Sequence, residues 1–141
     1  KGGGHELLAY RDGGVWVDVK AADVNEYLKE TAGGDFTAKD FRTWNATVLA
    51  AVGLAVRAAA DPPQSATARK RLANAVVKDV ARYLHNTPAV CRASYIDPRV
   101  FDCFDSGALL RAPLGRVVAE TGPNEFPERA KIERSVIRLL A

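Results

Sequence analysis

Four side chains in this sequence could handle a phosphate group: Lys39, Arg42, Arg92 and Tyr95. Lys39 and Arg42 stand three positions apart, as do Arg92 and Tyr95, and residues at that spacing share one face of a helix. A guanidinium keeps its charge and can bond two phosphate oxygens at once, and a tyrosine hydroxyl can serve as a covalent nucleophile. Each pair also has a plainer interpretation, as surface charge for Lys39 and Arg42 and as a core aromatic for Tyr95. The residues alone leave both interpretations open.

The first of these pairs falls at the start of a predicted helix over 38–60. Thr37 is the expected N-cap, and Asp40 is the acidic partner of a capping box. Phe36 and Phe41 can form a hydrophobic staple around the cap. The apolar face of this helix is expected to comprise Phe41, Trp44, Val48, Val52 and Ala55.

Caps and helix breakers predict further helices over 66–85, 88–96, 97–107 and 127–141. Ser65 or Thr67 should cap the first, and Thr87 should cap the second just before Pro88. The core face of the 66–85 helix is expected to comprise Leu72, Val76, Val80 and Tyr83, and that of the last helix Ile132, Val136 and Leu139. Tyr95 would then lie on a short helix between two prolines.

The front of the chain has a different pattern. Two short β-prone runs, 6–10 and 15–19, flank the turn signal RDGG. A helix over 24–32 follows, with Asp23 as its expected cap and Gly33 at its end. The chain is therefore predicted to be mainly α, with a small β element at the N-terminal end, and to form one domain over 1–141.

Positive charge is concentrated in the middle of the chain. Between residues 36 and 92 there are nine Lys and Arg against three Asp and Glu, a net charge of +6, whereas the whole chain carries +3. Arg71, Lys78 and Arg82 follow one another at i, i+7 and i+11, close to one line on a helix. This pattern suggests an anionic partner, nucleic acid first, whereas charge alone more often indicates only a solvated charged face.

Several classes of site are not expected. His5 and His85 are the only histidines, and Cys91 and Cys103 lack metal-ligand spacing, so no metal site is predicted. No apolar run approaches the roughly 20 residues of a membrane span, so no membrane partner is predicted. Cysteine usage fits a reducing cytoplasm.

Two segments resemble a known family. The stretch "FTAKDFRTWNATVLAA" is similar to the arginine segment of the type IB DNA topoisomerases, with its Lys-x-x-Arg-Thr-aromatic pattern. The stretch "NTPAVCRASYIDPRV" is similar to the tyrosine segment of that family, especially of its bacterial branch. The resemblance extends over about residues 22 to 140, and it implies the helical catalytic fold shared with the tyrosine recombinases.

The resemblance also implies an activity and roles for particular residues. Tyr95 would be the nucleophile, Arg42 one of two catalytic arginines, and Asn86 a donor to the phosphate. The enzyme would relax supercoiled DNA through a 3′-phosphotyrosyl link and religation, without ATP, metal or other cofactor. Lys39 and Arg92, together with the line of bases noted above, would contact double-stranded DNA. A monomer in the bacterial cytoplasm, at the nucleoid, is expected.

Part of the site that the resemblance implies has no match in this sequence. The family has a second arginine and a general-acid lysine upstream, and Lys1, Arg11 and Lys20 do not align with either. The N-terminal DNA-clamp domain of the family is also expected to lie outside this chain. The chain is therefore interpreted as the C-terminal portion of a catalytic domain that needs the rest of its polypeptide and that is poorly active alone.

Two alternatives stay open. A tyrosine recombinase shares this fold and chemistry, although it usually has His-x-x-Arg where this chain has Lys39-Asp-Phe-Arg42, and His where Asn86 stands. A non-catalytic helical module would bind DNA through Arg71, Lys78 and Arg82 and would use Tyr95 only for packing.

Overall fold

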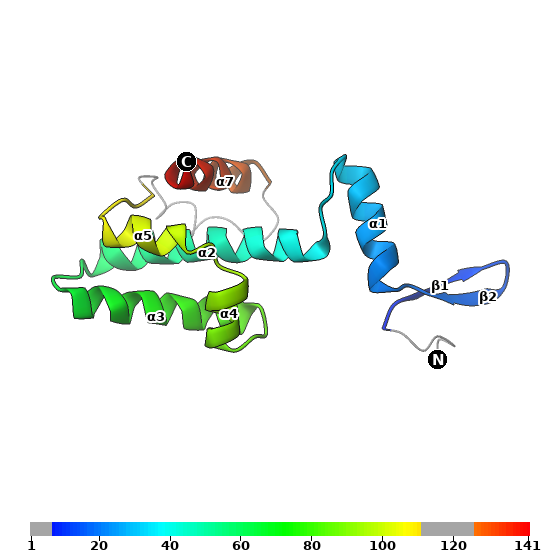
Figure 1. Ribbon diagram of the computed structural model, residues 1–141, viewed down its shortest axis with the longest axis horizontal. Coiled ribbons are helices and arrows are strands. Elements are labelled where there is room, and N and C mark those ends of the chain that lie inside the picture. The colour runs from blue at the N-terminus through cyan, green and yellow to red at the C-terminus, as the bar shows by residue number, and fades with distance from the viewer. Residues whose placement is uncertain (1–6, 111–125) are drawn as a thin grey trace. The chain divides into compact units, whose positions relative to one another are not determined.

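The computed structural model describes residues 7–110 and 126–141, with side chains from residue 129 onward in the second range. Its elements are β1 (Ala9–Asp12), β2 (Val15–Asp18), α1 (Ala21–Ala32), α2 (Ala38–Ala60), α3 (Ala66–Tyr83), α4 (Pro88–Ser94), α5 (Arg99–Asp105) and α7 (Phe126–Leu140) (Figure 1). The prediction of a mainly α chain with a small N-terminal β element is confirmed. The single domain expected over 1–141 comprises two compact units, 1–42 and 43–141, and their boundary falls inside α2.

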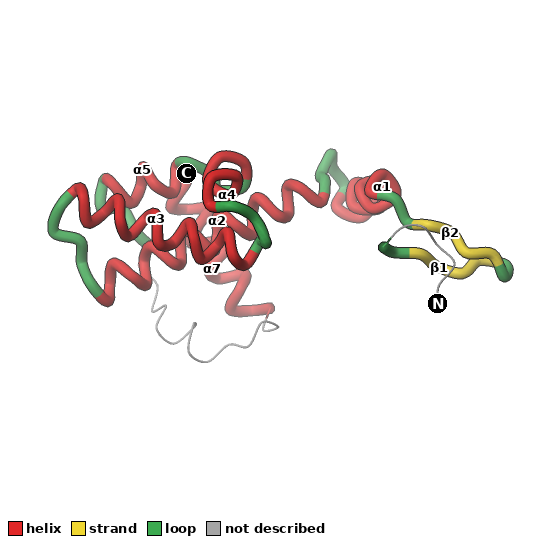
Figure 2. The backbone as a smooth tube through the Cα atoms, turned by 90° about the horizontal axis from the view of Figure 1, so that it is seen from below, coloured by secondary structure: helices red, strands yellow, loops and turns green. Residues whose placement is uncertain are grey.

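The first unit begins with a β-hairpin. Strands β1 and β2 pair antiparallel, with Arg11 opposite Trp16 (Figure 2). Gly13 and Gly14 form the turn at φ +52° and +91°, a region that side chains with a Cβ rarely enter. The predicted first strand was placed too early: it starts at Ala9, and the first two residues of RDGG belong to it because the two glycines suffice for the turn.

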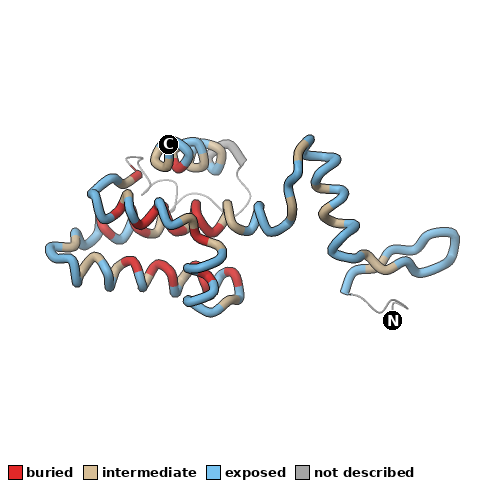
Figure 3. Tube along the Cα trace, viewed as in Figure 1, coloured by how far each residue is buried: buried red, intermediate tan, exposed pale blue. Residues whose placement is uncertain are grey.

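Helix α1 starts earlier than predicted. Lys20 is its N-cap, and Asp23 lies in the first turn, where its carboxylate accepts the Lys20 N–H at 2.8 Å. The prediction of Asp23 as the cap was wrong because an acidic side chain can also satisfy the helix start from three residues inside it. Gly33 ends the helix in the left-handed conformation, as predicted. No residue of α1 is buried (Figure 3).

Helix α2 begins just after Thr37, as predicted, and of the predicted capping box the structure shows the return contact of Asp40. The Asp40 carboxylate accepts the Thr37 N–H at 2.9 Å and the Thr37 hydroxyl at 2.6 Å. These hydrogen bonds hold the pKa of Asp40 below its ordinary value, and the bond from the Thr37 hydroxyl has the larger effect. The Asn25 side chain accepts the Ala38 N–H at 3.0 Å and so links α1 to this helix start. Phe36 and Phe41 are each about half exposed, so Phe41 is not the core residue that the helical pattern predicted.

The hydrophobic core lies in the second unit, mainly on α2, α3 and α5 (Figure 3). Helices α2 and α3 approach closely at Gly53, where an added Cβ would lie 3.0 Å from Val76 Cγ1. Val76 and Val80 are buried as predicted, whereas Tyr83 is 63% exposed. Tyr83 was wrongly assigned to the core, because at the end of α3 the core position is taken by the next residue, Leu84, which is 5% exposed.

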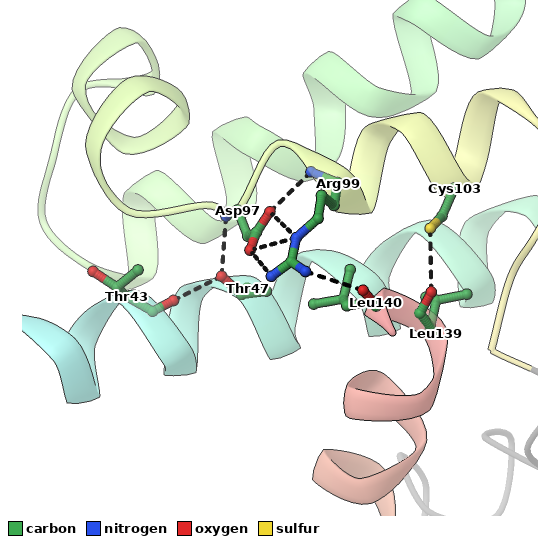
Figure 4. Close-up of polar contacts among 7 residues, drawn as sticks. All are labelled: Thr43, Thr47, Asp97, Arg99, Cys103, Leu139 and Leu140. Carbon is green, nitrogen blue, oxygen red and sulfur yellow. Dashed lines mark hydrogen bonds and ion pairs between the residues drawn. The ribbon is translucent and has the colours of Figure 1, made fainter.

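Helix α7 packs on α5 and closes this core. Its Val136 is completely buried. Near its start, the Arg129 guanidinium donates to Asn45 Oδ1 on α2 at 3.4 Å. At its end, the Cys103 thiol donates to the Leu139 carbonyl at 3.4 Å (Figure 4). The last helix is therefore held at both ends by elements of the same unit.

One helix of the described residues, α2, is long and apolar enough by length and composition to cross a membrane. Of its most apolar window, 44% is buried inside the protein. Together with the core contacts of α2, that burial is typical of a core helix, which needs the same apolar composition as a membrane span.

Candidate active site

The predicted site residues are divided between the two compact units. Lys39 and Arg42 lie on the first turns of α2, are both exposed and belong to the first unit. Asn86, Arg92 and Tyr95 belong to the second unit, within ten positions of one another around α4. The dipole of α2 favours anions at its start, where the Thr37 and Ala38 N–H groups already donate to Asp40 and Asn25.

Asn86 is placed by the way α3 ends. The Asn86 N–H donates to the Ala81 carbonyl at 2.9 Å and the His85 N–H to the Arg82 carbonyl at 3.2 Å. The His85 backbone is left-handed, at φ +55°. The two hydrogen bonds and this conformation form a Schellman motif, in which a histidine takes the usual place of glycine. The Asn86 amide donates to the Leu84 carbonyl at 3.3 Å. Because an amide carries two N–H donors, this contact uses one and leaves one for an acceptor such as a phosphate oxygen.

Tyr95 is the C-cap of the short helix α4. Thr87 caps the start of α4, where its hydroxyl accepts the Val90 N–H at 3.3 Å, and Pro88 occupies the first turn as predicted. The Tyr95 N–H donates to the Cys91 carbonyl at 3.1 Å. Tyr95 is partly buried against the core, whereas Cys91 and Ile96 on either side of it are almost fully buried. Cys91 and Ile96 are therefore core residues of this segment, and Tyr95 lies at the edge of the core.

The residues just after Tyr95 are tied down by a polar network that sequence reasoning missed (Figure 4). The Asp97 carboxylate accepts the Arg99 N–H at 2.9 Å and pairs with the Arg99 guanidinium, with Nη2 at 2.7 Å. The hydrogen bonds from the Arg99 side chain hold the pKa of Asp97 below its ordinary value. Partial burial of the carboxylate acts in the opposite direction, and the bond from the Arg99 N–H lowers the pKa further. Arg99 also donates through Nη1 to the Leu140 carbonyl at 3.0 Å, so the network reaches the end of α7.

Arg92 lies beside two bases that the sequence did not connect with it. Its guanidinium stacks on the Phe101 ring, 4.0 Å from the ring centre. Together with Arg69 and Lys70 of α3 it lines an open hollow of about 520 Å³. Arg69 and Lys70 stand more than 20 positions from Arg92 in the chain, so only the packing of α4 against α3 brings the three together.

The basic residues predicted to form a line on α3 differ in their contacts with acidic residues. Arg71, Lys78 and Arg82 are all exposed. Arg82 lies 3.3 Å from Asp79, which also pairs with Arg57. Part of the positive charge of this face is thus already neutralised within the protein, whereas the group around Arg92 has one acid, Asp105, on its wall.

The upstream basic residues Arg11 and Lys20 belong to the first unit. Arg11 lies in β1, and Lys20 is the exposed N-cap of α1. Lys1 and His5 lie outside the described residues.

Comparison with known proteins places these elements in a family. The model of the catalytic core of eukaryotic DNA topoisomerase I matches residues 6–101, which include Arg42, Asn86 and Tyr95. The chain is also similar to DNA topoisomerase 1B of Acanthamoeba polyphaga mimivirus, with 38% identity over 79 residues. That match covers 55% of this chain and 23% of the viral protein, so the chain spans about a quarter of the length of that relative. The family match covers 96 of 141 residues, and the chain therefore belongs to the type IB DNA topoisomerase family.

Proposed function

We propose that this chain supplies the nucleophile and two phosphate-binding residues of a DNA topoisomerase. The observation that carries the proposal is the setting of Tyr95, which is only partly buried although Cys91 before it and Ile96 after it are core residues, on a backbone whose N–H donates to Cys91. In the family match, Tyr95 occurs together with Arg42 and Asn86. A phenol of purely structural use would be expected among the core residues of this segment, as Cys91 and Ile96 are.

The proposed reaction is a reversible transesterification. The Tyr95 hydroxyl gives up its proton and its oxygen bonds to phosphorus, while the bond from phosphorus to the 5′ oxygen breaks and that oxygen takes up a proton. The product is a 3′-phosphotyrosyl link and a free 5′-hydroxyl, and the reverse attack reseals the strand. The number of bonds to phosphorus is conserved, so no ATP is needed between cleavage and resealing.

Charge develops on the non-bridging oxygens as phosphorus becomes five-coordinate. The guanidinium of Arg42 can bond two such oxygens, and the Asn86 amide can donate its second N–H to one. A preorganised donor at a comparable oxyanion is worth roughly 3–4 kcal/mol in the barrier. Asn86 is neutral, so its share is expected to be smaller than that of Arg42.

The proposal includes partners that this chain does not contain. Double-stranded DNA is the substrate, with Lys39, Arg92 and the α3 bases as contacts, and the rest of the same polypeptide supplies the general acid. The chain alone is therefore expected to fold and to relax DNA poorly. Membership of the bacterial branch, a cytoplasmic location at the nucleoid, the monomeric state and the absence of a membrane partner remain predictions from the sequence.

The test is covalent trapping with the whole protein. A nicked duplex that loses the cleaved end prevents resealing, so the wild type should accumulate a protein–DNA adduct that survives denaturation. Tyr95→Phe should lose the adduct and keep its affinity for DNA. Tyr83→Phe is a matched control, because Tyr83 is an exposed tyrosine at the end of α3.

The outcomes separate this function from its alternatives. An adduct that depends on Tyr95, together with relaxation of a supercoiled plasmid, supports the topoisomerase. An adduct without relaxation, accompanied by strand exchange between two DNA sites, supports the recombinase. Binding to DNA without any adduct would refute catalysis and support a binding module.

A further inference from the structure

A buried hydroxyl connects the helix of Arg42 to the segment of Tyr95. Thr47 lies on α2, five positions after Arg42, and is only 2% exposed. Its Oγ1 donates to the Thr43 carbonyl at 2.8 Å and accepts the Asp97 N–H at 3.1 Å (Figure 4). The hydroxyl thus acts as donor and acceptor at once, within its own helix and towards the tyrosine segment.

The Asp97 N–H has few other ways to find a partner. It lies after the end of α4 and before α5 begins at Arg99. The next residue is Pro98, which has no N–H, and the preceding Ile96 is 4% exposed. The Asp97 N–H is itself part-buried, and leaving a group withdrawn from water without a partner is unfavourable. Thr47 provides that partner from 50 positions away.

We infer that Thr47 is a positioning residue for Tyr95. It fixes the backbone two positions after Tyr95 to α2, the helix that also carries Arg42. This inference rests on the proposed function, since it concerns the geometry of the proposed nucleophile. In-line attack requires a close and aligned approach of the phenol oxygen to phosphorus, and a misplacement of about 1 Å can slow such a step by roughly 10²-fold.

The segment after Tyr95 is also held by a second set of contacts, which does not involve the Thr47 hydroxyl. The Asp97 side chain holds Arg99, and Arg99 bonds the Leu140 carbonyl of α7. Because these contacts use the carboxylate and not the N–H, they stay in place when the Thr47 hydroxyl is removed. Loss of the hydroxyl is therefore expected to loosen the position of the segment without detaching it from the protein.

The experiment uses the whole protein and compares Thr47→Val with Thr47→Ser. Valine keeps the shape of threonine and lacks the hydroxyl, whereas serine keeps the hydroxyl. Single-turnover cleavage of the nicked duplex should be slowed about 10- to 100-fold in Thr47→Val and largely restored in Thr47→Ser. The affinity for intact duplex should be unchanged in both, and the Asp97 amide should exchange its hydrogen faster in Thr47→Val only.

Two further variants keep the test decisive. Ser135→Ala removes another hydroxyl that bonds the carbonyl four residues earlier, at 2.9 Å on the exposed surface of α7, and it should cleave at the wild-type rate. If Thr47→Val fails to fold, Thr47→Ala is compared with Thr47→Ser, since both leave a similar void and only alanine lacks the hydroxyl.

The inference is overturned if the wild type forms the adduct and the variants without the hydroxyl cleave as fast as Thr47→Ser. It is also overturned if all Thr47 variants lose DNA binding in proportion to cleavage, because the role would then be structural. A wild type that forms no adduct refutes the proposed function, and this inference falls with it.

Discussion

The Asp97 carboxylate is predicted to hold the start of α5 and thereby to stabilise the second unit. Helix α5 has Pro98 at its N-cap position, with no side-chain cap of its own. The Asp97 carboxylate takes over that role from one position earlier, by accepting the Arg99 N–H at 2.9 Å. Replacing Asp97 by alanine removes this acceptor and the ion pair to the Arg99 side chain, which is 60% exposed.

These contacts determine how much Asp97→Ala should lower the free energy of unfolding. Removing an acceptor side chain from a helix start typically costs about 0.5–2 kcal/mol. The ion pair adds little, because one partner is largely in solvent, where such pairs are screened. We therefore expect Asp97→Ala to lower the free energy of unfolding by about 1–2 kcal/mol at neutral pH. Asp97→Asn should lose less, since its amide oxygen can still accept the Arg99 N–H.

The effect should depend on pH in a defined direction. The folded-state pKa of Asp97 is lowered, chiefly by hydrogen bonds from the Arg99 side chain. A lowered pKa means that the stabilisation is fully present above the ordinary pKa of an aspartate and is lost as the pH falls through the folded-state value. The difference between wild type and Asp97→Asn should thus be largest near neutral pH and shrink as the pH falls from about 5 to about 2.

Urea unfolding followed by helical circular dichroism, at several pH values, measures both effects. A free energy for Asp97→Ala within about 0.3 kcal/mol of wild type at neutral pH would contradict the capping role, given the cost expected above. A difference between wild type and Asp97→Asn that stays constant down to low pH would contradict the assignment of the charge.

Three further changes test the packing and the helix ends, each by the same urea unfolding measurement. Gly53→Leu should destabilise by about 1–3 kcal/mol, because even a Cβ there would lie 3.0 Å from Val76; an unchanged stability would show that α2 and α3 can separate freely. Ser65→Ala should cost about 0.5–2 kcal/mol, since the Ser65 hydroxyl accepts the Ala68 N–H at 3.1 Å, whereas Ser65→Thr should be nearly neutral. His85→Gly should stabilise by up to about 1 kcal/mol, because His85 has φ +55°; a loss of stability would instead indicate a side-chain contact that offsets the strain.

The sequence alone predicted those features that depend on residues close together in the chain. The helix starts at Thr37, Ser65 and Thr87 are each specified by a hydroxyl or carboxylate within three positions. The Lys39 and Arg42 pair and the segment ending at Tyr95 were likewise recognisable, because the residues of each lie within one or two turns of helix. The sequence pattern failed at the start of α1, because Asp23 could act either as the N-cap or as an acceptor inside the first turn.

The tertiary structure alone decided which apolar residues enter the core and which distant groups meet. Periodicity placed Phe41 and Tyr83 on core faces, yet both are half exposed or more, and Leu84 takes the core position at the end of α3. The contact of Thr47 with Asp97 joins residues 50 positions apart, and no local pattern specifies such a contact. Its physical origin is a need for hydrogen bonding that arises only when the chain is folded: a backbone N–H that is partly withdrawn from water gains from an acceptor that packing brings near it.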